Sequence, residues 1–377
     1  MRKAASTKMN SVMVWRWTLL PASETFIRNQ ISSYTTWKAT AVGAVAEKSP
    51  NADASDKIVF SKSSFDQLQK RVFRVTDLSF NLPKVVDAIA PTIIHAHFAI
   101  DGMRMRAIAK RRRIPLVVTL HGSDITSSPS KSGLRGRRYR IRLQKLFRDA
   151  DLFVAVSKHI ARSAQALGLD KNKIVVLPLG VPWRQAPTAS VERKNVVFVG
   201  RVVEKKGLEY LLESLAKLES HVIGHHRLIV IGEGPLRSEL EARSRELNLP
   251  VDFLGIRTPE EVQHHMERAV CLAVPSVTAH NGDTEGLPTV VFEAFRAATP
   301  VVGFNHAGIP EAVQNGYSGL LVEERDVAGL AMNLGQLLTD PTLTLKLGLN
   351  ARASFEQDYE SSMQTKKLEA LYERLVG

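Results

Sequence analysis

Two glutamates in this sequence have the spacing and the surroundings of a ligand site. Glu285 and Glu293 flank a segment that reads as a loop turning into a helix. Gly286 gives the turn its backbone freedom, Pro288 suits a first helical position, where an N–H would have no intrahelical partner, and Pro300 ends the helix. Glu285 therefore lies just before the helix and Glu293 lies inside it.

The start of this helix offers hydrogen-bond donors to an anion. Its body is apolar except for Glu293 and Arg296, which indicates near-complete burial. A buried carboxylate needs a partner, so Glu293 either accepts hydrogen bonds from ligand hydroxyls or pairs with Arg296 or a lysine. The amides free to hold anionic oxygens belong to Gly286, Leu287, Thr289 and Val290. Together these groups suit a sugar attached to a nucleoside diphosphate.

Two cations follow an earlier apolar run. In 200–207, which begins at Gly200, Arg201 and Lys206 flank a turn and could clamp a diphosphate. The next apolar run ends in a Gly-Glu-Gly turn at Gly232 and Gly234, which is weak evidence by itself.

Elements that could position these loops alternate along the whole chain. Short apolar runs predict strands at 12–15, 40–45, 58–60, 92–95, 116–120, 152–156 and 174–177, then at 196–199, 227–231, 251–254, 270–274, 301–304 and 319–322. Amphipathic segments between several of them predict helices, in the first half at 23–33, 102–110, 132–148 and 158–167. This alternation is typical of parallel sheets covered on both faces.

The alternation breaks once, in a proline-containing polar stretch. We therefore predict an α/β protein with a first lobe at 1–181, a linker at 182–194, a second lobe at 195–357 and a C-terminal helix at 358–377 that returns to the first lobe. Two doubly wound lobes would leave a cleft lined by loops from the carboxyl ends of their strands.

Composition and charge restrict the class of protein. The 377 residues are 44% hydrophobic and 24% charged, ordinary values for a globular chain, and a single cysteine excludes an intramolecular disulfide. Arg16 interrupts the first apolar run, so we interpret residues 1–21 as a tail entering a strand and not as a signal peptide. No other segment is long and apolar enough to span a bilayer, so a cytoplasmic protein is expected.

The net charge of +13 is concentrated in the first half. Basic residues cluster between 104 and 148, where acids are few. Such a patch would attract nucleic acid, anionic lipid or a phosphorylated substrate, and a merely solvated face is the plain alternative.

In their order and spacing, the loops resemble the retaining glycosyltransferases of family 4, also called glycosyl transferases group 1. Members have the GT-B fold, with two Rossmann-like doubly wound parallel-sheet lobes and an interdomain cleft. The two glutamates eight positions apart, the Gly-Arg-x4-Lys-Gly loop and the Gly-x-Gly-Pro turn all match the family pattern. The resemblance implies that Arg201 and Lys206 hold the donor diphosphate, that Glu293 binds ribose hydroxyls and that Glu285 lies beside the donor sugar. The base is then expected near Gly232 and Gly234.

First-lobe motifs extend the resemblance. The run 119–124, Thr-Leu-His-Gly-Ser-Asp, is similar to a family motif and implies a hydrogen bond from His121 to the donor sugar or the reacting centre; a structural histidine is the alternative. Ser-Glu-Thr-Phe-Ile at 23–27 and Ile-His-Ala-His-Phe-Ala at 94–99 resemble a subset that builds bacterial exopolysaccharides. Residues expected on the acceptor side are Ser23, Glu24 and His97.

Two further details bear on cofactors and on backbone strain. His95 and His97 would point to one face of a strand, as metal ligands could, but no third ligand has a convincing spacing, so no metal is expected. Ala307 stands where relatives often have glycine, which is tolerable unless the position needs a positive φ.

The implied function is transfer of a hexose from a nucleotide-diphospho sugar, with a UDP-sugar favoured, to a hydroxyl of a growing lipid-linked bacterial surface polysaccharide. His121 and Glu285 are the candidate catalytic residues, and no metal or other cofactor is expected. The basic patch would hold the protein at the inner face of the cell membrane. Three alternatives stay open: a nucleotide-sugar epimerase of the same architecture, a glycoside hydrolase built on the two glutamates, and a basic nucleic-acid-binding protein.

Overall fold

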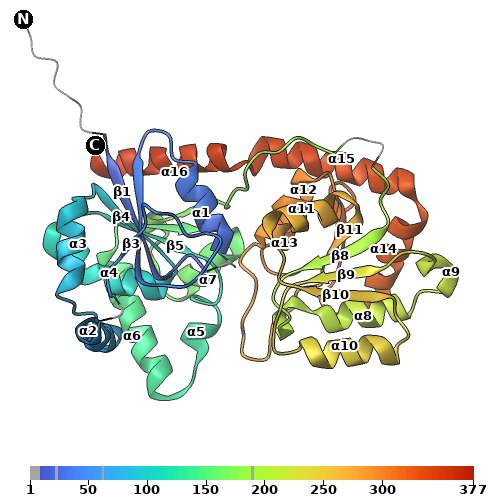
Figure 1. The fold of residues 1–377 in the computed structure, drawn as a ribbon, viewed down its shortest axis with the longest axis horizontal. Helices are drawn as coiled ribbons and strands as arrows, with labels where there is room; N and C mark the ends of the chain where they lie inside the picture. Colours follow the sequence, from blue (N-terminus) through green and yellow to red (C-terminus); the bar gives the residue numbers. More distant parts are fainter. Residues whose placement is uncertain (1–8, 22–23, 62, 188–190) are drawn as a thin grey trace, which may run out of the picture. The chain divides into compact units, whose positions relative to one another are not determined.

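The computed structural model describes residues 9–21, 24–61, 63–187 and 191–377. The chain forms two compact units. The first comprises residues up to 156 together with 160–180 and 361–377, and the second comprises 157–159 and 181–360. In each unit a parallel sheet is covered by helices (Figure 1).

The first unit contains a seven-stranded sheet in the order β3-β2-β1-β4-β5-β6-β7. Its strands are β1 (Ser11–Leu19), β2 (Lys38–Ala46), β3 (Lys57–Ile58), β4 (Ile93–His97), β5 (Leu116–Leu120), β6 (Leu152–Ala155) and β7 (Ile174–Val176). All neighbouring pairs are parallel, and Val14 of β1 pairs with Ala41 on one side and His95 on the other. The chain leaves β1 toward β2 and later returns on its other side with β4, so the strand order reverses between β1 and β4.

Helices of the first unit pack on both faces of this sheet. They are α1 (Thr25–Ser32), α2 (Ser64–Thr76), α3 (Asn81–Ile89), α4 (Ala99–Arg112), α5 (Ser127–Ser130), α6 (Gly133–Asp149), most of α7 (Lys158–Ala166) and α16 (Ser361–Val376). Helices α2 and α3 were not predicted from the sequence. The C-terminal helix α16 is part of this unit, where Leu368 and Tyr372 lie in the core with Val14 and Ile27. Glu369 fixes it by accepting the backbone N–H groups of residues 35–37.

The second unit contains a six-stranded parallel sheet in the order β10-β9-β8-β11-β12-β13. Its strands are β8 (Asn195–Val199), β9 (Leu228–Ile231), β10 (Val251–Gly255), β11 (Ala269–Val274), β12 (Val301–Phe304) and β13 (Gly319–Val322). The strand order reverses between β8 and β11. In open α/β sheets, ligands bind outside the carboxyl ends of the strands at such a switch point.

The helices of the second unit include η3 (Glu204–Lys206), α8 (Leu208–Ala216), α9 (Ser220–Ile223), α10 (Arg237–Glu246), α11 (Pro259–Glu267), α12 (Thr289–Arg296), α13 (Ile309–Ala312), α14 (Val327–Thr339) and α15 (Pro341–Asp358). Two expectations about α12 were wrong. Pro288 is the N-cap, with extended ψ of 121°, and not the first helical residue. The helix ends at Arg296, because Ala298 adopts a left-handed φ of 52° two residues before Pro300.

The single cysteine is buried in β11, and burial raises the pKa of the Cys271 thiol to about 12. A thiol of this kind is a packing group and not a nucleophile. None of the helices in the described part of the chain has the length and apolar character needed to traverse a bilayer.

Candidate functional site

The switch point of the second sheet brings together two loops that the sequence singled out. One follows β8 and contains η3; the other follows β11 and leads into α12. Lys206 Nζ of the first loop lies 3.1 Å from Glu285 Oε1 of the second. Lys205 Nζ lies 3.1 Å from Asp283 and 3.8 Å from the same oxygen of Glu285. Two predicted site residues, 79 positions apart in the sequence, therefore form one ion pair.

The two lysines determine the protonation state of Glu285. The side chain is buried, and burial by itself would raise the pKa of its carboxyl group. The ammonium groups of Lys206 and Lys205 outweigh that effect, and the pKa lies below its ordinary value. Glu285 is consequently an ionised carboxylate at neutral pH, and Lys206 is not a free cation.

Arg201 lies in the same loop as Lys206 but stays unpaired. Its side chain is exposed, and among the described residues it has no ion-pair or hydrogen-bond partner. The backbone amides of the segment before and at the start of α12 are likewise not used by other described backbone or side-chain acceptors. These amides belong to Gly286, Leu287, Thr289 and Val290. A guanidinium and a row of unused amides are each groups that can bind an anion.

Glu293 lies in the second turn of α12 and is half-buried, less buried than the sequence indicated. Burial raises the pKa of its carboxyl group, and the nearby positive charges of Arg296 and Arg184 oppose this only in part. The suggested pair with Arg296 does not form. Arg296 donates instead to Gln263 Oε1, at 3.1 Å from Nε, and to the carbonyl of Pro182 at 3.0 Å. Within the described residues Glu293 has no partner, which leaves its oxygens available to ligand hydroxyls.

The predicted glycines have local packing roles. A Cβ at Gly232 would lie 1.9 Å from the carbonyl oxygen of Gly200, and one at Gly234 would lie 2.1 Å from that of Val202. The turn after β9 thus lies directly on the loop after β8, and only glycine permits this approach. Gly200 itself lies beneath the Lys206 side chain, whose Cε would be 3.3 Å from a Cβ at position 200.

Ala307 shows that its position does need a positive φ. Its φ is 51°, which lies in the left-handed region that residues other than glycine rarely adopt. The next residue, Gly308, approaches the α12 loop so closely that a Cβ there would lie 1.9 Å from the carbonyl oxygen of Gly286. The strained alanine therefore lies beside the candidate anion site.

This unit also contains a buried histidine that was not predicted as a site residue. His306, just after β12, is 3% exposed at its side chain, and its Nδ1 lies 2.9 Å from Glu324 Oε2. Its Nε2 is buried without a partner among the described residues. Its positive charge, when protonated, would act on Glu285. The sequence did contain a signal for this site, because His306 is a polar residue just after the apolar run at 301–304.

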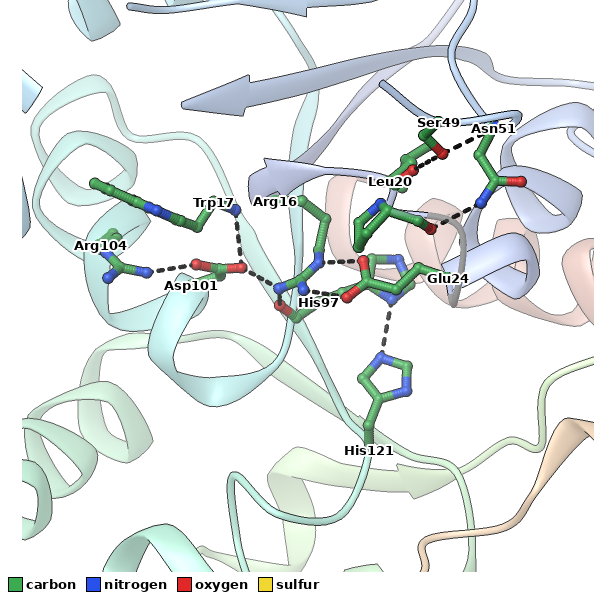
Figure 2. A network of polar contacts seen from close by, with 11 residues as sticks. Arg16, Trp17, Leu20, Glu24, Ser49, Asn51, His97, Asp101, Arg104 and His121 are labelled. Atoms are coloured by element: carbon green, nitrogen blue, oxygen red, sulfur yellow. Dashed lines mark hydrogen bonds and ion pairs between the residues drawn. The ribbon is translucent and has the colours of Figure 1, made fainter. Parts of the chain in front are cut away.

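The first unit gathers its candidate residues at its own switch point, around Arg16 (Figure 2). Arg16 forms ion pairs with Glu24, to which Nε donates at 2.7 Å, and with Asp101. Asp101 also accepts from Arg104 at 2.7 Å. The Arg16 guanidinium lies 4.3 Å from the centre of the Phe98 ring. Arg16, which the sequence analysis treated only as a break in an apolar run, therefore positions Glu24.

Two predicted histidines meet beside this network. His97 Nδ1 and His121 Nε2 are 3.0 Å apart, and Figure 2 shows the second nitrogen of His121 pointing away from His97. His97 is fully buried and contacts His121, so its own ring is closed to solvent. His95 stacks on His97 with ring centres 4.6 Å apart, as expected for residues on one face of a strand. Ser23, the third residue expected on the acceptor side, lies outside the described residues.

The buried surroundings determine which nitrogens carry protons. Burial lowers the pKa of His97 and of His121 well below the ordinary value, so both rings are neutral at neutral pH. His97 Nε2 is buried with no partner among the described residues, and an N–H there would be unsatisfied. The proton of His97 therefore belongs on Nδ1, which donates to His121 Nε2. His121 then keeps its own proton on Nδ1, the nitrogen that faces away, and acts as a hydrogen-bond donor.

Backbone strain lies at the same place. Phe98 connects β4 to α4 with a φ of 70°, which is rare for an aromatic residue. Its ring lies 4.3 Å from the ring of His121. In the described part of the chain, no three His, Cys, Asp or Glu side chains are grouped as a metal site would require.

Comparison with known proteins identifies the family. A family model described as Glycosyl transferases group 1 matches residues 182–354, and one described as Glycosyltransferase Family 4 matches residues 41–183. The chain belongs to the family 4 glycosyltransferases. The resemblance predicted from the motifs is thus confirmed, and the protein is an enzyme.

Two curated relatives of this glycosyltransferase have related names. WcaL of Escherichia coli K12, named for colanic acid biosynthesis, is 28% identical over 353 residues, which cover 88% of this chain and 84% of WcaL. AmsK of Erwinia amylovora, an amylovoran biosynthesis glycosyltransferase, is 28% identical over 312 residues, which cover 78% of this chain and 74% of AmsK.

A solved structure confirms the GT-B fold. HepE of Anabaena, in complex with UDP and glucose, superimposes with a TM-score of 0.76 at 20% sequence identity, covering 97% of this chain and all of HepE.

Proposed function

We propose that this glycosyltransferase moves a hexose from a UDP-sugar to a hydroxyl of a growing, lipid-linked bacterial surface polysaccharide, with retention of configuration. The observation that carries this proposal is the ion pair of Lys206 and Glu285 beside the unused amides of the α12 start. The names of WcaL and AmsK favour an exopolysaccharide product. The ligands of HepE favour a UDP-sugar as donor.

The proposed chemistry places positive charge where the leaving group forms. Breaking the bond from the anomeric carbon to the diphosphate leaves negative charge on the diphosphate oxygens and an oxocarbenium-like ring. Arg201, the α12 amides and Lys206 would stabilise the diphosphate, so a divalent cation is not needed for this role. Glu285, ionised through its lysine partners, would place a negative charge near the ring.

The acceptor proton has a destination in this scheme. The acceptor hydroxyl forms its bond to the anomeric carbon on the face that the diphosphate leaves, and its proton passes to a diphosphate oxygen. No protein base is then required, which agrees with a His121 that donates a hydrogen bond from Nδ1. Glu293 would bind the ribose hydroxyls of the donor.

The basic patch of the first unit would contact the anionic inner face of the membrane. The structure corrects its extent, because several of its members are paired with acids. Arg104 pairs with Asp101, Arg112 with Asp87, Arg142 with Asp77, and Arg106, Lys110 and Arg148 pair with Asp149. Asp149 is one carboxylate facing three cations, so it offsets only one positive charge. The cations without an acidic partner in the described chain lie mainly on α6, with Arg111 and Arg113 at the end of α4.

A donor and product assay tests the proposal. Purified enzyme is incubated with UDP-, GDP- or ADP-sugars and a lipid-linked glycan acceptor, and free nucleotide and product are followed together by chromatography. We expect UDP to appear in step with glycosylated acceptor, and NMR of the product to show the anomeric configuration of the donor. Donor converted without an acceptor would instead identify an epimerase, and an inverted product would exclude the proposed geometry.

A further inference from the structure

The outer face of α2 carries apolar side chains that the rest of the described chain leaves uncovered. Phe65, Leu68, Val72 and Val75 follow one another at three- and four-residue steps and so share one face of the helix. They are between 46 and 65% exposed. Phe73, on another face, is fully buried and attaches the helix to the core. A continuous exposed apolar face indicates a surface that binds a partner.

Large apolar residues continue this face onto its surroundings. Leu78 and Phe80 lie just past the end of α2, and both are largely exposed. On α6, Leu134 is 83% exposed and Ile141 is about half exposed. We call the four residues of α2, together with Leu78 and Phe80, the apolar face.

A basic groove lies between the end of α2 and α6. Its volume is about 690 Å³, and its lining includes Val75, Leu134, Arg137, Arg138, Ile141 and Lys145. The α6 residues recur at three- and four-residue steps along one side of the helix. Arg138 donates to the carbonyl of Val75, which joins the two helices.

The charge in this groove is of one sign. Asp77 is the single carboxylate among the described lining residues, and Arg142 neutralises it at 2.5 Å. Arg137 and Lys145 are exposed, and neither has an ion-pair partner within the described chain. The groove therefore offers unpaired cations directly beside exposed apolar side chains.

An anionic bilayer matches this combination better than other anionic surfaces. A phospholipid layer presents phosphate groups at one depth and acyl chains a few ångströms deeper, so cations and apolar side chains are satisfied together. A nucleic acid would pair with the cations but would leave the aliphatic residues Leu68, Val72 and Val75 in water. An acidic protein partner would have the same difficulty unless it also carried an apolar patch.

We propose that α2 and α6 form a docking surface for an anionic phospholipid bilayer, in which the apolar face enters the boundary between head groups and acyl chains and the groove holds a lipid phosphate. This inference rests on the proposed function, because a lipid-linked acceptor must be met at a membrane.

The docking surface is also connected to the candidate acceptor residues of the same unit. Phe73 of α2 stacks on Trp17, with ring centres 5.8 Å apart. The amide of Trp17 donates to Asp101, which binds Arg16, and Arg16 holds Glu24. Docking through α2 would therefore connect the lipid surface to the acceptor-side network through Phe73 and Trp17.

Vesicle flotation with the full-length enzyme tests the docking surface. Phosphatidylcholine vesicles with and without phosphatidylglycerol are compared for wild-type enzyme, Phe65→Ser/Leu68→Ser and Arg137→Gln/Lys145→Gln. Because the altered side chains are exposed, thermal unfolding should not change. Each cation near an anionic surface contributes roughly fivefold in binding, so the basic double variant should bind anionic vesicles about 25-fold more weakly. The serine variant should lose binding by about tenfold or more.

Matched controls come from exposed residues of other helices. Leu345→Ser/Leu349→Ser on α15 and Lys366→Gln/Lys367→Gln on α16 change the same residue types away from α2 and α6 and should bind like wild type. The proposal is overturned if the wild-type enzyme binds neither vesicle, or if the control variants lose as much binding as the test variants. It is also overturned if transfer RNA binds tightly and displaces the enzyme from vesicles while the serine variant behaves as wild type.

Failure of this inference can be told apart from failure of the proposed function. Nucleotide release in the donor assay is measured with a lipid-free glycan acceptor in the absence of vesicles. Sugar transfer without vesicle binding would refute only the docking surface, and vesicle binding without any sugar transfer would refute only the proposed function.

Discussion

His97 illustrates how one buried residue can set the chemistry of another. Its Nδ1 lies 3.0 Å from His121 Nε2, and its own Nε2 is buried without a partner among the described residues. Hydrogen-bonding groups that lack partners are costly inside proteins, so the protons are expected on Nδ1 of both rings. His121 is then committed to donating from Nδ1. We regard His97 as a positioning residue for His121.

The first prediction concerns this pair. His97→Asn keeps a donor near the position of Nδ1, whereas His97→Leu removes it. We expect kcat to fall about tenfold or more in the leucine variant, with a smaller change in the asparagine variant and little change in KM for the donor. Nitrogen-15 NMR of histidine-labelled protein should show His121 protonated on Nδ1 in the wild type. The tautomer assignment is wrong if His121 is protonated on Nε2.

The second prediction concerns Arg201, an exposed cation without a partner in the described chain. Arg201→Ala should leave thermal unfolding unchanged and lower kcat on the order of a hundredfold, because removal of one group that stabilises a developing anion commonly costs that much. Arg245→Ala, an exposed arginine on α10, is the control and should retain wild-type turnover. Wild-type activity in Arg201→Ala would remove this residue from the donor site.

At the level of elements, the turn before α13 holds an alanine in a conformation that suits glycine. Ala307 has a φ of 51° and lies beside Gly308, which contacts the loop leading into α12. The left-handed conformation costs a non-glycine residue about 1–2 kcal/mol, and part of this is offset because alanine loses less chain entropy than glycine on folding.

The third prediction follows from this strain. Ala307→Gly should raise the free energy of unfolding by about 0.5–1 kcal/mol in urea titrations. Ala242→Gly, at an exposed position in the interior of α10, should lower it by a similar amount, because glycine is the poorer residue in a helix interior. If both variants are destabilised equally, the turn does not require the left-handed conformation.

On the scale of the whole molecule, the first unit contains histidines that must stay neutral for it to fold. Burial lowers the pKa of His95 to about 3, and lowers those of His97 and His121 well below the ordinary value near 6.5. His95 also joins β4 to the C-terminal helix, because its Nδ1 lies 2.5 Å from the hydroxyl of Tyr372. In the unfolded chain all three would titrate normally.

The fourth prediction is acid sensitivity. Below about pH 6.5 the unfolded state binds protons that the folded state does not, so stability is present above that pH and is lost as the pH falls. Each such histidine contributes about 1.4 kcal/mol per pH unit. Urea titrations from pH 8 to pH 5, with unfolding of the first unit followed by hydrogen exchange in β4 and β5, measure the slope. A flat profile would contradict neutral buried histidines. His221→Gln, an exposed residue, should not alter it.

The fold class and the family could be predicted from the sequence because they depend on local patterns. Buried parallel strands are continuous apolar runs, so most strands and several of the helices between them were located, and β5, β12 and β13 were located to the residue. Helices α2 and α3 were not predicted, although both are amphipathic, because nothing was assigned between the apolar runs at 58–60 and 92–95. The glutamate and glycine motifs were visible because turns demand particular residue types.

Only the tertiary structure decided how the candidate residues are paired. The ion pair of Lys206 with Glu285, the ion pair of Arg16 with Asp101 and the hydrogen bond between His97 and His121 all join residues that come from different strand ends. The sequence by itself determined which residue types arrive at the carboxyl edges of the two sheets, because period and turn chemistry are local. Partner choice and protonation depend on distance and burial, which exist only once the sheets have formed.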